Sequence, residues 1–122
     1  MVQVLVIDDN LEIRENTAEL LDLEGYKVLT AENGKEGYEM VLKWKPNVVL
    51  CDMMMPGSDG SAFLNWMKAN TLTQATPIIF FTAGLPTVDV RIYLSKQGND
   101  YLKKPFTQEA LLKSVQKFVT IN

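Results

Sequence analysis

The sequence predicts a doubly wound α/β fold, in which helices cover both faces of a five-stranded parallel β-sheet. Five short apolar segments alternate along the chain with longer segments of helical periodicity. The apolar segments lack the polar alternation of half-exposed strands, and such runs are typical of parallel strands that are buried on both faces. No repeat, low-complexity tract or linker-like stretch divides the chain, so we expect one domain over residues 1–122.

The expected strands cover residues 4–7, 27–31, 48–51 and 78–81, and a short segment around Tyr101. The segment Val48-Val49-Leu50-Cys51 is the clearest example, because it contains no polar position before its end. Right-handed crossovers connect such strands, and ligands of doubly wound folds bind outside the carboxyl ends of the strands. Functional residues are therefore expected directly after the strands.

A helix is expected after each strand. Asn10 is a favoured N-cap for the first helix, and Gly25 is a favoured residue just past its end. Between them, Ile13, Thr17, Leu20 and Leu21 fall on one helical face. The other expected helices cover residues 34–44, 60–69, 87–97 and 107–119.

Composition excludes several classes of function. The net charge of -3 and the pI near 4.9 argue against direct binding of nucleic acid, which is held mainly by clustered lysine and arginine. A single cysteine and no histidine leave only oxygen ligands for a metal. The apolar run at residues 4–7 is too short for a signal peptide or a membrane span, so we expect a cytoplasmic protein without a membrane partner.

Three aspartates follow neighbouring strands of the expected sheet. Asp8 and Asp9 come after the first strand, and Asp52 comes after the third. Alone, Asp8-Asp9-Asn10 would be explained as a strand-to-helix turn with a good N-cap. If the first and third strands are neighbours, however, three carboxylates converge and need a cation. A hard divalent ion suits such a site, and Mg²⁺ is the natural choice.

Asp52 is also a candidate nucleophile. An ionised aspartate attacks phosphorus without the help of a base. Phosphoryl transfer further requires a fixed cation and hydrogen-bond donors around the acceptor. Lys104 offers the cation, Thr82 a hydroxyl donor, and the small residue Ala83 access to a backbone N–H group. Each alone could be a solvated lysine or a strand end, but together they indicate a phosphoryl-transfer site.

These residues resemble the response-regulator receiver domains of two-component (phosphorelay) signalling, the chemotaxis-regulator-like modules that sensor histidine kinases serve. The resemblance spans essentially the whole chain. It implies a flavodoxin-like (βα)5 fold with strand order 2-1-3-4-5. The matching motifs are Val6-Ile7-Asp8-Asp9-Asn10, Gly25-Tyr26, Ala31 with Asn33-Gly34, Asp52-Met53-Met54-Met55-Pro56 with Asp59-Gly60, Thr82-Ala83, and Asp100-Tyr101-Leu102-Lys103-Lys104-Pro105-Phe106.

The resemblance also implies roles for individual residues. Asp52 would be the phosphoacceptor, and Lys104, Thr82 and Ala83 would stabilise the phosphoryl group. Lys104-Pro105 is a candidate for a cis peptide bond. The implied ligands of Mg²⁺ or Mn²⁺ are Asp8, Asp9, Asp52 and the backbone carbonyl of Met54.

Thr82 and Tyr101 are the implied switch residues, which would remodel the surface formed by the fourth helix, the fifth strand and the fifth helix. The implied phosphoryl donor is a sensor histidine kinase or a histidine phosphotransfer protein. The output would pass to a downstream protein or to an effector domain absent from this sequence, or would act through a phosphorylation-driven dimer that forms on the same surface.

Some positions depart from the family pattern. Gly37 replaces a common alanine, which should cost about 1 kcal/mol within a helix. Asn47 replaces a common aspartate, and Gln97-Gly98 stands where Gly-Ala is usual. Cys51 precedes the phosphoacceptor and, by strand alternation, should be a buried core thiol rather than a redox sensor. None of these positions is a predicted site residue.

Three other functions would each leave a different signature in the sequence. A Mg²⁺-dependent phosphatase with an aspartyl nucleophile would carry an Asp-x-Asp signature, but Met54 occupies the place of the second acid. A dinucleotide- or flavin-binding module would carry Gly-x-Gly-x-x-Gly after the first strand, where acidic residues stand instead. A degenerate receiver that acts only as a scaffold would not need the complete set of site residues.

Overall fold

The structure is a computed structural model and describes residues 2–53, 60–82 and 100–119. The helix expected at residues 87–97 lies outside the described residues, as do two predicted site residues, Met54 and Ala83. Within the described ranges, no helix is long and apolar enough to cross a membrane.

Five parallel strands form one sheet in the order β2-β1-β3-β4-β5, which confirms the predicted topology. Two strands extend one residue further toward their carboxyl ends than the sequence predicted. Asp52 pairs with Phe81, and Thr82 pairs with Lys103, so both polar residues belong to the ladder itself. The strands are β1 (Gln3–Ile7), β2 (Lys27–Ala31), β3 (Val48–Asp52), β4 (Ile78–Thr82) and β5 (Asp100–Lys103).

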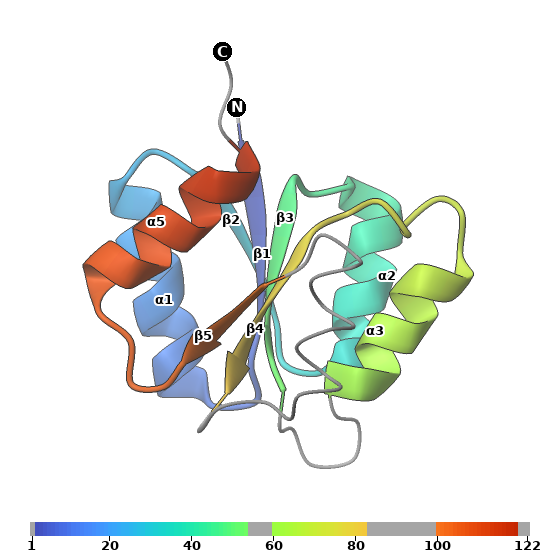
Figure 1. The fold of residues 1–122 in the computed structure, drawn as a ribbon, viewed down its shortest axis with the longest axis horizontal. Coiled ribbons are helices and arrows are strands. Elements are labelled where there is room, and N and C mark those ends of the chain that lie inside the picture. The colour runs from blue at the N-terminus through green and yellow to red at the C-terminus, as the bar shows by residue number, and fades with distance from the viewer. Residues whose placement is uncertain (1, 54–59, 83–99, 120–122) are drawn as a thin grey trace.

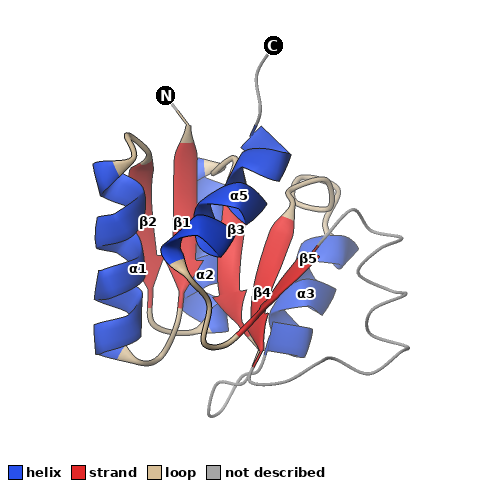
Figure 2. Ribbon diagram, turned by 60° about the vertical axis from the view of Figure 1, so that its left-hand side comes forward, coloured by secondary structure: helices blue, strands red, loops and turns tan. Residues whose placement is uncertain are grey.

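Helices cover both faces of this sheet, as predicted. In Figure 1 the sheet is seen nearly edge-on, with α1 and α5 on one side and α2 and α3 on the other. Figure 2 shows the strands running in parallel, with their carboxyl ends at the lower edge. The described helices are α1 (Leu11–Leu23), α2 (Gly34–Trp44), α3 (Gly60–Ala69) and α5 (Gln108–Val119).

The boundaries of α1 follow the predicted capping residues. The Asn10 side-chain oxygen accepts a hydrogen bond from the Ile13 N–H group at 2.9 Å, which satisfies one of the backbone donors left free at a helix start. The helix ends at Leu23, and Gly25 follows with a φ of 93°. This left-handed conformation is readily available to glycine, so Gly25 ends the helix as expected.

Alternate residues of the central strands enter two separate cores. On the side of α1 and α5, Val4, Val6 and Leu50 pack with Leu21 and Leu111. On the side of α2 and α3, the intervening strand residues form the second core, which includes Leu5, Ile7, Val49, Cys51, Val41, Phe63 and Met67. Cys51 is fully buried there, which confirms its expected place in the core.

Gly37 allows α2 to approach β1 closely. A Cβ atom at this position would lie 2.8 Å from Cγ1 of Ile7 and still closer to its Cδ1 atom. Such distances are shorter than van der Waals contact, and Ile7 is fully buried and cannot move away freely. The departure from alanine at this position therefore fits the packing of the second core.

Asn47 fixes the opposite end of β1. Its side-chain oxygen accepts a hydrogen bond from the Gln3 N–H group at 2.8 Å, and its own N–H group donates to the Gln3 carbonyl, also at 2.8 Å. These two bonds join the first residue of β1 to the residue that precedes β3. Asn47 therefore has a structural role away from the carboxyl ends of the strands.

Candidate functional site

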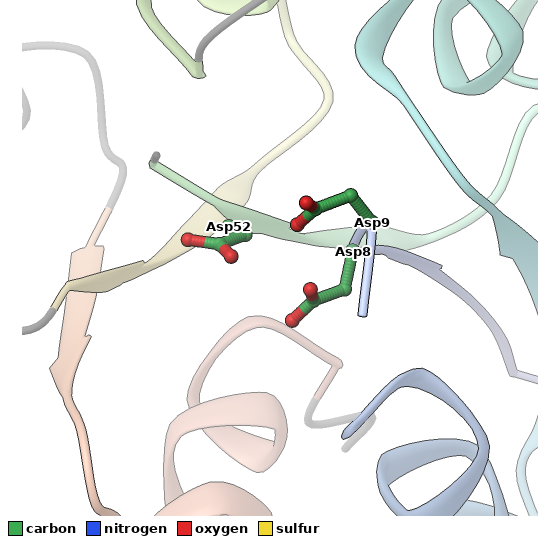
Figure 3. Close-up of side chains that lie close together, drawn as sticks. All are labelled: Asp8, Asp9 and Asp52. Atoms are coloured by element: carbon green, nitrogen blue, oxygen red, sulfur yellow. The ribbon is translucent and has the colours of Figure 1, made fainter. Parts of the chain in front are cut away.

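Three carboxylates meet at the carboxyl ends of β1 and β3. The parallel register pairs Ile7 with Cys51, so the residues that follow each of them emerge side by side. Carboxylate oxygens of Asp8, Asp9 and Asp52 lie within 4.8 Å of one another. Figure 3 shows the three side chains gathered around a common space. The predicted convergence of the acidic residues is therefore present in the structure.

The three acids differ in their exposure to solvent. Asp8 is fully buried and Asp52 is 7% exposed, whereas Asp9 is an exposed residue. Their burial is a consequence of the fold, because Asp8 and Asp52 continue strands that helices cover on both faces. Two carboxylates are therefore held where water cannot fully screen their charges.

Lys104 provides the positive charge closest to the two buried acids among the described residues. Its Nζ atom lies 3.1 Å from Oδ2 of Asp52 and 3.8 Å from Oδ2 of Asp8. The residue directly follows β5, and its backbone N–H group donates to the carbonyl of Thr82 at 2.6 Å. The peptide bond between Lys104 and Pro105 is cis. Through its side chain, Lys104 links the edge strand β5 to the acidic cluster at the centre of the sheet.

Asp8 is constrained by several hydrogen bonds. Its N–H group donates to the Ala31 carbonyl at 3.1 Å, and its own carbonyl accepts from the Arg14 guanidinium at 2.8 Å. Oδ1 accepts from the Asn10 N–H group at 2.9 Å. Oδ2 is buried and accepts no hydrogen bond from any residue that the structure describes.

Burial raises the pKa of the Asp8 carboxyl above the ordinary value for aspartate. The carboxylates of Asp52 and Asp9 raise it further, whereas the hydrogen bond from Asn10 and the charge of Lys104 lower it. A group that is hard to ionise, with one oxygen left without a hydrogen bond, is a natural ligand for a cation. A cation would supply the missing partner for Oδ2 and offset the repulsion between the acids.

The donor set suits a hard divalent cation. The described part of the chain offers three carboxylates and one ammonium group in this cluster, so the local charge stays negative when all four are ionised. Carboxylate oxygens are preferred ligands of Mg²⁺ and Mn²⁺, and no histidine or thiolate competes here. The fourth predicted ligand, the Met54 carbonyl, lies outside the described residues.

The two predicted switch residues lie on β4 and β5. Thr82 is the last residue of β4 and is 7% exposed, and it follows Phe81, the Cα partner of Asp52. Tyr101 pairs with Phe80 and packs, partly buried, against the core on the side of α2 and α3. Thr82 therefore lies on the strand next to β3, one position beyond the Cα partner of Asp52, and Tyr101 lies against the core on the side of α2 and α3.

Sequence reasoning did not identify Arg14. Its contact is with a backbone carbonyl, and no motif in the sequence indicates such a contact. The only available signal was its position in the first turn of α1, because long side chains in helices point back toward the N-terminus.

The sequence model of the response regulator receiver domain matches residues 4–116. The chain is 34% identical to protein PilH of Pseudomonas aeruginosa over 116 residues, which cover 94% of this chain and 95% of PilH. It is 34% identical to the phosphate regulon transcriptional regulatory protein PhoB of the same organism over 89% of this chain, but only 48% of PhoB. It is 32% identical to the transcriptional regulatory protein CpxR of Escherichia coli, over 95% of this chain and 48% of CpxR. The chain thus spans about half the length of PhoB and CpxR.

Solved structures show the same fold. The chemotaxis protein CheY4 of Vibrio cholerae superposes with a TM-score of 0.88 at 30% identity, covering 98% of this chain and 99% of CheY4. A response regulator receiver domain protein from Clostridium thermocellum superposes with a TM-score of 0.85 at 32% identity, covering 98% of this chain and 94% of that one.

Proposed function

Because the chain belongs to the response regulator receiver domain family, we propose that it is a signalling switch which takes a phosphoryl group onto Asp52. The observation that carries this proposal is the contact of 3.1 Å between Lys104 Nζ and Asp52 Oδ2, inside a cluster of three carboxylates. The contact holds the acceptor oxygen beside a fixed positive charge. Such a charge is needed where negative charge develops during phosphoryl transfer.

The chemistry would be a direct displacement at phosphorus. A carboxylate oxygen of Asp52 attacks the phosphorus atom of the donor, and a P–O bond forms while the bond to the leaving group breaks. With a phosphohistidine donor, the imidazole nitrogen leaves with the bonding electron pair and takes up a proton. Lys104 stays beside the new phosphoryl oxygens, and the Thr82 hydroxyl and the Ala83 N–H group would donate hydrogen bonds to them.

A separate reaction, hydrolysis, returns the switch to its resting state. Water attacks the phosphorus atom, the acyl phosphate bond breaks, and inorganic phosphate leaves as the Asp52 carboxylate is restored. The chain would thus catalyse only its own phosphorylation and dephosphorylation.

Asp8, Asp9, Asp52 and the Met54 carbonyl would hold Mg²⁺ or Mn²⁺ beside the acceptor. A bound divalent ion would neutralise negative charge on the acceptor and on the phosphoryl oxygens. The buried Oδ2 of Asp8 supports this assignment, because no described residue gives it a hydrogen bond.

The family suggests the partners of this chain. The donor would be a sensor histidine kinase or a histidine phosphotransfer protein. Thr82 and Tyr101 would couple the phosphoryl group to the surface around β5 and α5, including the expected helix at 87–97. That surface would act on a downstream protein, an effector domain or a second copy of the chain.

Acetyl phosphate tests the proposal directly. With Mg²⁺, wild type should gain the mass of one phosphoryl group, detected by intact-protein mass spectrometry, and should lose it on standing. Asp52→Asn should gain none, because its amide is not a nucleophile. Asp100→Asn is the matched control, because this acid pairs with Lys117 away from the cluster. No gain in the wild type, or an equal gain in Asp52→Asn, would rule out Asp52 as the acceptor.

A further inference from the structure

Three polar groups of Asp8 form hydrogen bonds within the described part of the protein, and a fourth does not. Its N–H group, its carbonyl and Oδ1 are bonded to Ala31, Arg14 and Asn10, respectively. Only Oδ2 lacks a hydrogen bond among the described residues. The bonded groups fix the backbone and the rotation of the side chain, so the direction of Oδ2 is set before any ligand arrives.

Arg14 contributes the one charged donor among these three hydrogen bonds. It lies in the first turn of α1, and its backbone N–H group donates to the Asn10 carbonyl at 2.9 Å. Because side chains in helices lean toward the N-terminus, the guanidinium reaches back to the Asp8 carbonyl, to which it donates at 2.8 Å. Hydrogen bonds from a charged donor are shorter and stronger than neutral ones. Arg14 therefore ties the segment from Asp8 to Asn10 to the rigid helix that follows it.

The geometry points to Arg14 as a positioning residue for the divalent cation: by holding the Asp8 carbonyl, it keeps the Asp8 carboxylate in the acidic cluster, where Oδ2 lies 3.8 Å from Lys104 Nζ. This inference rests on the proposed metal site. It goes beyond that site by assigning the geometry of a ligand to a residue that touches neither the ion nor the phosphoryl group.

Electrostatics alone predicts the opposite effect. A guanidinium close to a cation site repels the cation, so removing its charge should strengthen Mg²⁺ binding if Arg14 acts only through that charge. If Arg14 instead fixes the ligand, its removal should weaken binding, because groups that orient metal ligands contribute to affinity without touching the metal. The sign of the change in affinity therefore separates the two roles.

The experiment measures Mg²⁺ affinity by calorimetry on metal-free protein. Arg14→Met removes the charge and the donor but keeps an unbranched side chain, and its Mg²⁺ affinity should fall by about 10- to 100-fold. Lys113→Met is the control, because it removes one positive charge from an exposed position on α5. Its Mg²⁺ affinity should match that of the wild type. Affinity in Arg14→Met that equals or exceeds the wild type would overturn the inference.

Arg14→Lys provides a second comparison that preserves charge. Lysine is a single-point donor without the planar fork of arginine, so it should hold the carbonyl less firmly. Its Mg²⁺ affinity should lie between those of the wild type and Arg14→Met. If Arg14→Met does not fold by circular dichroism, Arg14→Lys carries the test: weaker binding than in the wild type supports positioning, and equal binding overturns it.

Phosphorylation by acetyl phosphate gives a further readout. In Arg14→Met the Mg²⁺ concentration that gives half of the maximal rate should rise more than the maximal rate falls, a pattern that general loss of stability would not produce. If wild type binds Mg²⁺ and takes up phosphoryl groups while both Arg14 variants match it, only this inference fails. If wild type binds no Mg²⁺, the proposed metal site fails as well.

Discussion

Replacing Asp8 with asparagine should stabilise the metal-free protein, although Asp8 is a proposed metal ligand. At an effective dielectric constant near 20, the Asp52 carboxylate within 4.8 Å repels Asp8 by about 3 to 4 kcal/mol. Lys104 Nζ, at 3.8 Å, attracts it by about 4 kcal/mol on the same scale. These two contributions nearly cancel, so the burial of Asp8 decides the outcome.

The remaining cost lies at Oδ2, a buried acceptor with no hydrogen bond among the described residues. Such a group costs about 1 to 3 kcal/mol, and the neutral amide of asparagine removes the charge from this position. We therefore expect Asp8→Asn to raise the free energy of unfolding at pH 7 by about 1 to 3 kcal/mol. The melting temperature should rise by about 3 to 5 °C for each kcal/mol in a chain of this length.

The pH dependence of this difference follows from the raised pKa of Asp8. Below the ordinary aspartate pKa of about 3.9, the carboxyl is protonated in both the folded and unfolded states, so it carries no ionisation penalty. As the pH rises through the raised pKa of Asp8 in the folded state, wild type loses stability that Asp8→Asn keeps. The stability gap between the two proteins should therefore open above about pH 4.

Urea unfolding in EDTA, from pH 4 to pH 7, measures this gap, and Asp100→Asn serves as the matched control at an exposed ion pair. Adding Mg²⁺ should stabilise wild type by an amount that grows with the logarithm of the Mg²⁺ concentration above its Kd, but leave Asp8→Asn unchanged. The reasoning is refuted if Asp8→Asn is less stable than wild type at pH 7 without metal, or if the gap does not change with pH.

Two further predictions concern Lys104 and Gly37. Lys104→Met should slow phosphorylation by acetyl phosphate by about 100-fold or more, because it removes the cation beside the acceptor. Lys103→Met, at the neighbouring exposed position, should not slow phosphorylation. Equal rates in the two variants would contradict the role assigned to Lys104. Gly37→Ala should lower the free energy of unfolding by about 1 to 2 kcal/mol in urea, because the clash with Ile7 exceeds the gain in helix propensity. Adding Ile7→Val, which removes Cδ1, should recover part of that loss; a Gly37→Ala variant as stable as wild type would show that the core adapts without cost.

Much of the fold could be predicted because its strongest signals are local. The apolar run at 48–51 marks a strand buried on both faces, and Asn10 and Gly25 mark the two ends of α1. The convergence of Asp8 and Asp52 followed from one further assumption, that their strands are neighbours. The register of Ile7 with Cys51 confirms that assumption.

The features that sequence could not predict depend on contacts between distant segments. Gly37 looked like a weak point in α2, because a helix pattern does not reveal how closely the helix approaches Ile7. Asp52 and Thr82 were placed just after their strands, but pairing with Phe81 and Lys103 extends the ladder to include them. Arg14 was missed because its partner is a backbone carbonyl, which has no sequence signature.

The contact between Lys104 and the acids also bears on the local stability of β5. This edge strand is four residues long, is partly exposed and pairs with β4, so the Lys104 contact adds to a limited set of contacts that resist local opening. Opening would carry Lys104 away and leave Asp8 and Asp52 facing each other without their nearest described cation. The attraction between Lys104 and the two acids therefore stabilises β5 against local opening. A bound divalent ion would neutralise part of the charge on the acids and so weaken this attraction. The strand that carries Tyr101 would then open locally more readily than in the metal-free protein.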